Sequence, residues 1–187
     1  MDTTYLIIVV VALVIVAALF ILVRARRKRS ERLHDQHDQL GPEYDRTVQA
    51  MGGAKKAQTE LEERRKHVEA LDIHPLSASE RERYLADWAA VQSKFVDEPG
   101  QAIVDADSLI MQVMRTRAYP VSDFEQRAAD LSVTYPALVS NYRAAREIAI
   151  KNEQHQADTE ELREAMIHYR SLFEELLGTE TVVGKEN

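Results

Sequence analysis

"SASERERYLADWAAVQSKF", Ser77 to Phe95, contains in one stretch the pattern that decides the fold of this chain. Ser77 followed three residues later by Glu80 is the capping-box pattern that begins a helix. The apolar residues that follow recur at the spacing of one helix face, and they are Tyr84, Trp88, Val91 and Phe95. The stretch therefore predicts a helix with one buried face.

The same combination of a start signal and an apolar stripe recurs four more times before Gly178. The second helix begins near Asp97 with Pro99 in its first turn, and the fourth begins at Pro136. The third and fifth have the capping pairs Ser122 with Glu125 and Asp158 with Glu161. No stretch alternates polar and apolar residues with period two, so we expect an all-α protein. Residues 77–178 are predicted to form a compact bundle of about five helices, with residues 179–187 as a flexible tail.

The third predicted helix is short and lies between the pairs Tyr119-Pro120 and Tyr135-Pro136. Such a helix must be held by its neighbours, because about ten residues do not form a stable helix alone in water. Aromatic and arginine side chains also contribute much of the binding energy of protein interfaces. We therefore take as candidate partner contacts Tyr119, Phe124, Arg127 and Tyr135, and for Phe124 we favour packing in the core over contact with a partner.

The N-terminal part predicts a membrane anchor, residues 1–29. Tyr5 to Val23 is uncharged and, at about 1.5 Å per helical residue, reaches roughly the 30 Å thickness of a bilayer core. It is followed by a basic cluster of Arg24, Arg26, Arg27, Lys28 and Arg29. Basic residues beside a first span stay on the cytoplasmic side, which places the short N-terminus outside and the body inside. The cluster is also a candidate contact with membrane lipid, and a cleavable signal peptide or an extracytoplasmic body are the alternatives.

We predict that residues 30–76 form a polar stalk that is only partly helical. Gly41-Pro42 and Gly52-Gly53 interrupt this segment. Ala57 to Ile73 contains strong helix formers but only scattered apolar residues, without a sustained heptad. The stalk is therefore predicted to separate the anchor from the bundle.

Catalytic chemistry has no recognisable signature in this sequence. The chain lacks cysteine, and no phosphate loop, nucleophile elbow or metal-protease motif is present. His34 and His37 lie one helical turn apart, but two imidazoles on a polar stalk make a weak metal site. We predict no enzyme activity, no catalytic residue, no cofactor and no metal. The alternative is a ligand-binding or enzymatic head with a pocket lined by Tyr142, His168 and Tyr169.

The charge distribution argues against nucleic acid as a partner. Residues 24–32 carry a charge of +5, so the rest of the chain sums to −12 within a net charge of −7. An acidic domain repels phosphate.

Four segments resemble a widespread family of uncharacterised bacterial single-pass membrane proteins, often labelled hypothetical or secreted. They are "GPEYDRTV" (41–48), "YPVSDFEQRAADLSV" (119–133), "NYRAAREIA" (141–149) and "TEELREAMIHYRSLFEELL" (159–177). The resemblance covers nearly all of the chain after the predicted span. It implies a bacterial source and supplies no catalytic residue.

Together these observations predict a single-pass protein of the bacterial inner membrane with a cytoplasmic helical domain. Its expected role is protein interaction or scaffolding, with a protein partner beside the lipid. A purely structural assembly role is the further alternative, and the sequence leaves oligomerisation open.

Overall fold

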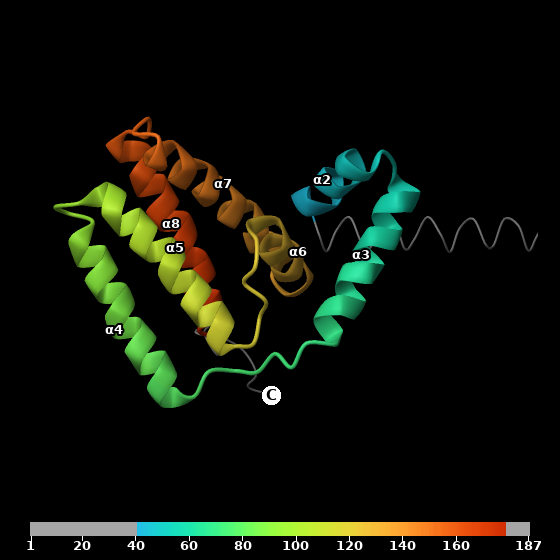
Figure 1. Cartoon of the computed structure of the whole chain (residues 1–187), viewed down its shortest axis with the longest axis horizontal. Coiled ribbons are helices and arrows are strands. Elements are labelled where there is room, and N and C mark those ends of the chain that lie inside the picture. Colours follow the sequence, from blue (N-terminus) through green and yellow to red (C-terminus); the bar gives the residue numbers. More distant parts are fainter. Residues whose placement is uncertain (1–40, 179–187) are drawn as a thin grey trace, which may run out of the picture. The chain divides into compact units, whose positions relative to one another are not determined.

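The computed structural model describes residues 41–178, and within them all regular structure is α-helical (Figure 1). Seven helices and no strand lie in this part, so the all-α prediction is confirmed there. None of these helices is long and apolar enough to cross a membrane. The predicted span, the basic cluster, the pair His34 and His37, and the C-terminal tail lie outside the described residues.

The five helices predicted from residue 77 onward are all present, and most begin where the sequence indicates. They are α4 (Ala78–Lys94), α5 (Pro99–Thr116), α6 (Phe124–Thr134), α7 (Pro136–Glu153) and α8 (Thr159–Leu176). The capping boxes of Ser77 with Glu80 and of Asp158 with Glu161 are both formed. Pro99 and Pro136 occupy the first helical position, where the missing N–H has no cost.

The N-cap of helix α6 lies one residue later in the chain than predicted. Asp123, and not Ser122, is the N-cap, and its Oδ1 accepts a hydrogen bond from the Gln126 N–H at 2.9 Å. Aspartate caps a helix at least as well as serine, so the adjacent carboxylate takes the role. Glu125 is thereby free to pair with arginines of other helices.

Two helices end on a residue in the left-handed conformation that usually favours glycine. Ala118 after α5 has φ 65° and His155 after α7 has φ 56°. The following N–H groups close the turns, from Tyr119 to the Met114 carbonyl and from Gln156 to the Lys151 carbonyl. Gly178 ends α8 in the same conformation, as the sequence predicts.

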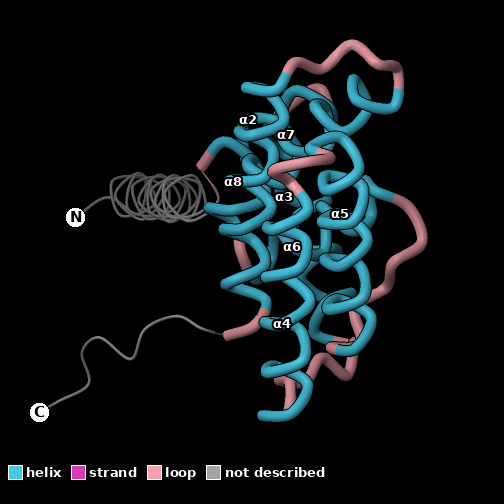
Figure 2. The backbone as a smooth tube through the Cα atoms, turned by 90° about the vertical axis from the view of Figure 1, so that its left-hand side faces the viewer, coloured by secondary structure: helices cyan, strands magenta, loops and turns pink. Residues whose placement is uncertain are grey.

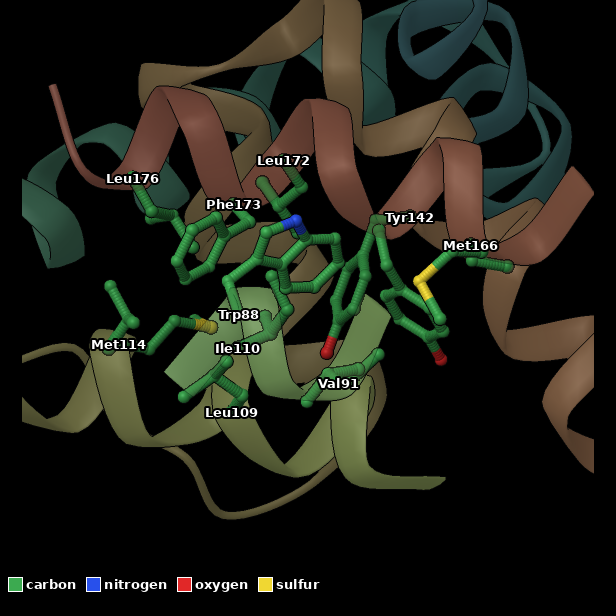
Figure 3. Packing of buried hydrophobic residues seen from close by; sticks show 14 of the residues in the cluster. Trp88, Val91, Leu109, Ile110, Met114, Tyr142, Met166, Leu172, Phe173 and Leu176 are labelled. Atoms are coloured by element: carbon green, nitrogen blue, oxygen red, sulfur yellow. The ribbon is translucent and has the colours of Figure 1, made fainter. Parts of the chain in front are cut away.

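The main core lies between the five C-terminal helices (Figure 3). Contacts run from α4 to α5, then to α8, α7 and α6, so helices distant in sequence become neighbours (Figures 1 and 2). Trp88 of α4 stacks on Phe173 of α8, with ring centroids 4.6 Å apart. The predicted stripes of these helices are buried apart from Phe95, Phe124 and Leu138, each of which is partly exposed.

The described part of the predicted stalk folds onto the bundle instead of standing apart from it. It forms α2 (Pro42–Met51) and α3 (Ala54–Glu69), which pack against each other, with α3 on α6 and α2 on α7. The compact unit therefore begins at Pro42 and not at residue 77. We call α2 and α3 together the N-terminal hairpin. Its buried apolar side chains, Tyr44, Ala57, Leu61 and Val68, lie outside the main core cluster.

Candidate functional site

Two of the four predicted partner contacts are inside the protein. Tyr119 is 3% exposed, and its hydroxyl donates to Thr134 Oγ1 at 3.3 Å. Arg127 is 6% exposed, and its Nε donates to the Tyr142 hydroxyl at 3.1 Å. Neither side chain offers a partner more than a small contact area.

The other two contacts are partly exposed but lie in different surroundings. Phe124 packs its ring against Tyr142, with the centroids 5.0 Å apart. The Tyr135 hydroxyl accepts a hydrogen bond from Arg117 Nη1 at 2.7 Å, and the same nitrogen donates to the Leu176 carbonyl. Phe124 therefore combines the favoured core packing with some exposure, whereas Tyr135 contacts the Arg117 side chain that joins α5 to the end of α8.

The three residues of the alternative pocket do not come together as a pocket. Tyr142 and Tyr169 are fully buried and meet edge to face at 6.3 Å. His168 lies near the surface, with Nε2 3.6 Å from Glu164 of the same helix. No observation therefore favours a ligand held by these three side chains.

Beside the two tyrosines lies a buried carboxylate, Asp107. Its Oδ1 and the Tyr169 hydroxyl are both buried and have no hydrogen-bond partner within residues 41–178. Burial raises the pKa of Asp107, although Arg146 and Arg127 act in the opposite direction. Burial, and secondarily the charge of Asp107, raises the pKa of Tyr142 to about 12. These side chains form a polar cluster inside the bundle in which some buried oxygen atoms lack a hydrogen-bond partner.

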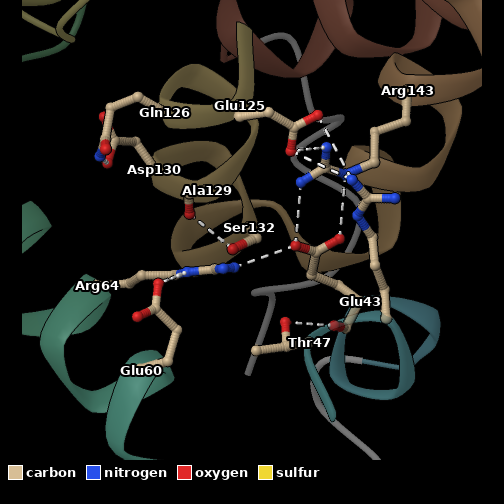
Figure 4. A network of polar contacts seen from close by, with 11 residues as sticks. Glu43, Thr47, Glu60, Arg64, Glu125, Gln126, Ala129, Asp130, Ser132 and Arg143 are labelled. Carbon is tan, nitrogen blue, oxygen red and sulfur yellow. Dashed lines mark hydrogen bonds and ion pairs between the residues drawn. The ribbon is translucent and has the colours of Figure 1, made fainter. Parts of the chain in front are cut away.

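A network of charged side chains attaches the N-terminal hairpin to the bundle (Figure 4). Glu43 of α2 is 3% exposed and lies between Arg64 of α3, at 3.1 Å, and Arg143 of α7, at 3.3 Å. Arg143 Nη1 also donates to Glu125 of α6 at 2.7 Å, and Arg46 of α2 pairs with the same carboxylate at 3.2 Å. Burial opposes ionisation of Glu125, but Arg143 and Arg46 outweigh it and lower its pKa.

An open pocket of about 380 Å³ adjoins this network, between α2, α6 and α7. We call it the Phe124 pocket, and it is lined by Arg46, Asp123, Phe124, Glu125, Arg143, Arg146, Glu147 and Ile150. The guanidinium carbons of Arg127, Arg143 and Arg146 lie 5.7 to 6.0 Å from the centroid of the Phe124 ring. The pocket thus has an aromatic wall surrounded by cations.

A second, more apolar depression of about 260 Å³ lies between α4 and α8. We call it the α4/α8 groove, and it is lined by Gln92, Phe95, Arg163, Met166, Ile167 and Arg170. Ile167 is 57% exposed. Trp88, one turn before Gln92, stacks on Phe173, so α4 and α8 are held together near one end of the groove.

Sequence reasoning missed this groove, although α8 carries a signal for it. The buried residues of α8 are Leu162, Ala165, Met166, Tyr169, Leu172, Phe173 and Leu176. Ile167 is a large apolar residue outside this buried set. It lies with Arg163, Met166 and Arg170 at positions i, i+3, i+4 and i+7, which form a second face of the same helix.

Within residues 41–178, no group of three or more His, Asp or Glu side chains is arranged to hold a metal ion. No protein family, curated protein or solved structure matches this chain at a significant level. The proposal for its function therefore rests on the surface and the interior of residues 41–178.

Proposed function

We propose that this chain is a membrane-anchored helical module that binds another protein through the α4/α8 groove. The observation that carries the proposal is the apolar floor of the groove, in which Ile167 is 57% exposed, Phe95 is partly exposed and Met166 shows only its edge. An apolar surface rimmed by polar residues is typical of a recognition site.

The occupant that fits this groove is an amphipathic helix with acidic residues beside its apolar face. The lining contains two arginines and no carboxylate, although the chain as a whole is acidic. Arg163 and Arg170 are seven residues apart on one helix, which is about 10 Å or two turns. A partner helix laid along the groove would therefore match them with Asp or Glu spaced about two turns apart.

The two arginines are available for such a partner at little cost. Arg163 pairs with Glu160 at 3.0 Å, and Arg170 pairs with Glu174 at 2.7 Å. All four side chains are more than half exposed. Exposed pairs of this kind contribute about 0 to 1 kcal/mol, so they can be exchanged for contacts with a partner.

The anchor in this proposal is the uncharged segment from Tyr5 to Val23, followed by the basic cluster of residues 24–29. These features support a single span of the bacterial inner membrane with the bundle on the cytoplasmic side. A reporter fused after Asn187 tests the orientation. It should be active if it requires the cytoplasm, and activity of a periplasm-dependent reporter would reverse the assignment.

Site-specific photocrosslinking in intact membranes tests the interaction. A photoreactive amino acid at Gln92, in the groove, should give one discrete crosslinked band. The same amino acid at Leu85, which is 46% exposed on α4 and not part of the groove lining, is the control. Ile167→Asp should abolish the band, because it places a carboxylate on the apolar floor.

Equal crosslinking from Gln92 and Leu85, or a band that survives Ile167→Asp, would remove the support for the groove. Ile167 is more than half exposed, so this substitution should leave the fold intact. Circular dichroism of the purified variant checks that condition.

A further inference from the structure

The Phe124 pocket is a second site, separate from the α4/α8 groove, with guanidinium donors that have no partner in the described residues. Arg46 uses only Nη2, toward Glu125. Arg146 uses only Nη1, which lies 3.7 Å from Asp107 and 3.4 Å from Glu153. Within residues 41–178, Nε and one Nη of each arginine therefore remain open toward solvent or a ligand.

The acidic side chains of the pocket are mostly occupied. Glu125 is held by Arg143 at 2.7 Å and by Arg46 at 3.2 Å. Asp123 caps α6 through its Oδ1, and its Oδ2 accepts from Ser122 at 3.4 Å. Glu147 forms no side-chain hydrogen bond or ion pair among the described residues, although, after the hydrogen bond to Glu161, its charge also helps to raise the pKa of Lys151. The charges of the lining balance, so the open donors, and not an excess of positive charge, determine what the pocket can bind.

We infer that the Phe124 pocket binds a small carboxylate with a short apolar body. Its carboxylate would accept hydrogen bonds from Arg46 and Arg146, and its apolar body would lie against Phe124 and Ile150. A guanidinium and a carboxylate match in shape and form two parallel hydrogen bonds. The volume of about 380 Å³ lies within the range of roughly 300 to 1,000 Å³ that is usual for small-molecule sites.

A phosphate group fits the same pocket less well. Its charge at neutral pH is about −1.5 to −2, and Asp123, Glu125 and Glu147 line the same cavity. A carboxylate carries a single charge and meets less repulsion from these three groups. A ligand that is polar on all sides would also make no apolar contact with the exposed side chain of Ile150.

Binding at this pocket is linked to docking of the N-terminal hairpin. Arg46 belongs to α2, whereas Arg146 and Ile150 belong to α7. A ligand held by both arginines joins the hairpin to the bundle, and it binds only when α2 is docked. Linkage then requires that the ligand also stabilise the docked hairpin.

Hydrogen exchange of the full-length chain in detergent micelles tests this inference with three probes. Butyrate carries the carboxylate and the apolar body, butylamine has the same body without the carboxylate, and inorganic phosphate has charge without the body. Butyrate should slow exchange in α2 and α3 by about tenfold at a concentration ten times its dissociation constant. Butylamine and phosphate should leave it unchanged.

Arg46→Gln and Arg146→Gln should each abolish the effect of butyrate. Arg65→Gln is the matched control, because Arg65 is 50% exposed in an ion pair with Glu62 of the same hairpin but lies outside the pocket. Arg146 also faces buried Asp107, so Arg146→Gln could fail to fold. In that case Arg46→Gln alone tests the pocket, because the Arg46 side chain is 51% exposed and its replacement should leave the fold intact. Equal protection by butylamine, protection by phosphate alone, no protection by butyrate, or full protection in Arg46→Gln would each overturn the inference.

Discussion

Glu43→Gln should release the N-terminal hairpin from the bundle without unfolding the main core. The Glu43 side chain is 2% exposed, and its two arginine partners are 14% and 11% exposed. Removing one partner of a buried ion pair costs about 3 to 5 kcal/mol, because the remaining charge stays buried and unpaired. Here the cost should be about 3 kcal/mol, at the low end of that range. The reason is that both arginines keep a carboxylate partner, Glu60 for Arg64 and Glu125 for Arg143.

The effect should be local, because no side chain of α2 or α3 belongs to the main core cluster. A cost of about 3 kcal/mol corresponds to roughly a hundredfold faster amide exchange in a segment that opens on its own. Hydrogen exchange measured by mass spectrometry, peptide by peptide, should show this acceleration in residues 42–69 and little change in α5 and α8.

Glu62→Gln is the matched control, since Glu62 lies in the same hairpin but forms an exposed pair with Arg65 at 2.7 Å. It should change exchange by less than a few-fold. Acceleration of α5 and α8 in step with the hairpin would show that the described helices open as one cooperative unit. Unchanged exchange in Glu43→Gln would show that the ionic network does not hold the hairpin. Either result would refute the reasoning.

Three further changes test the bundle itself, each by urea unfolding of the purified chain. Ala118→Gly should raise the free energy of unfolding by about 1 kcal/mol, because Ala118 is exposed and has φ 65°, where glycine is unstrained; a loss of stability would contradict this. Phe124→Ala should cost about 2 kcal/mol, less than the roughly 3 to 5 kcal/mol of a fully buried phenylalanine, since Phe124 is only partly buried against Tyr142; no measurable cost would mean that the ring contact is not maintained in solution. Asp107 has a raised pKa in the folded state, so the folded protein holds a proton there that the unfolded chain has lost, and stability should fall as the pH rises from the ordinary Asp pKa through the folded one. Asp107→Asn should remove this part of the pH dependence, and identical slopes in the two proteins would show that Asp107 does not titrate abnormally.

Local signals determined most of the helices. A cap such as Ser77 or Asp158 acts on backbone groups within three residues, and the apolar stripe that follows it selects the buried face. The start of α6 shifted to Asp123 because two adjacent residues could both cap this helix. These interactions are contained in a few consecutive residues, so the order of residue types is enough to predict them.

The candidate sites depended on contacts that the sequence does not display. Arg127 and Phe124 lie in the same short helix, yet Arg127 is buried against Tyr142 while Phe124 borders an open pocket. Ile167 is exposed and lines the α4/α8 groove, although Met166 just before it is buried in the core. Which face of a helix stays open is decided by the helices that pack around it.

The hairpin shows the same division most clearly. Strong helix formers from Ala57 onward predicted a helix in a polar stalk, and a helix is present there. Its docking depends on charged groups far apart in the chain, since Glu43 meets Arg143 across 100 residues and Arg46 meets Glu125 across 79. In the sequence, such polar residues are interpreted as exposed to solvent, because only the tertiary fold brings their charged partners close. The sequence by itself thus determined where the helices form, and only the tertiary structure decided which charges meet and which surfaces remain open.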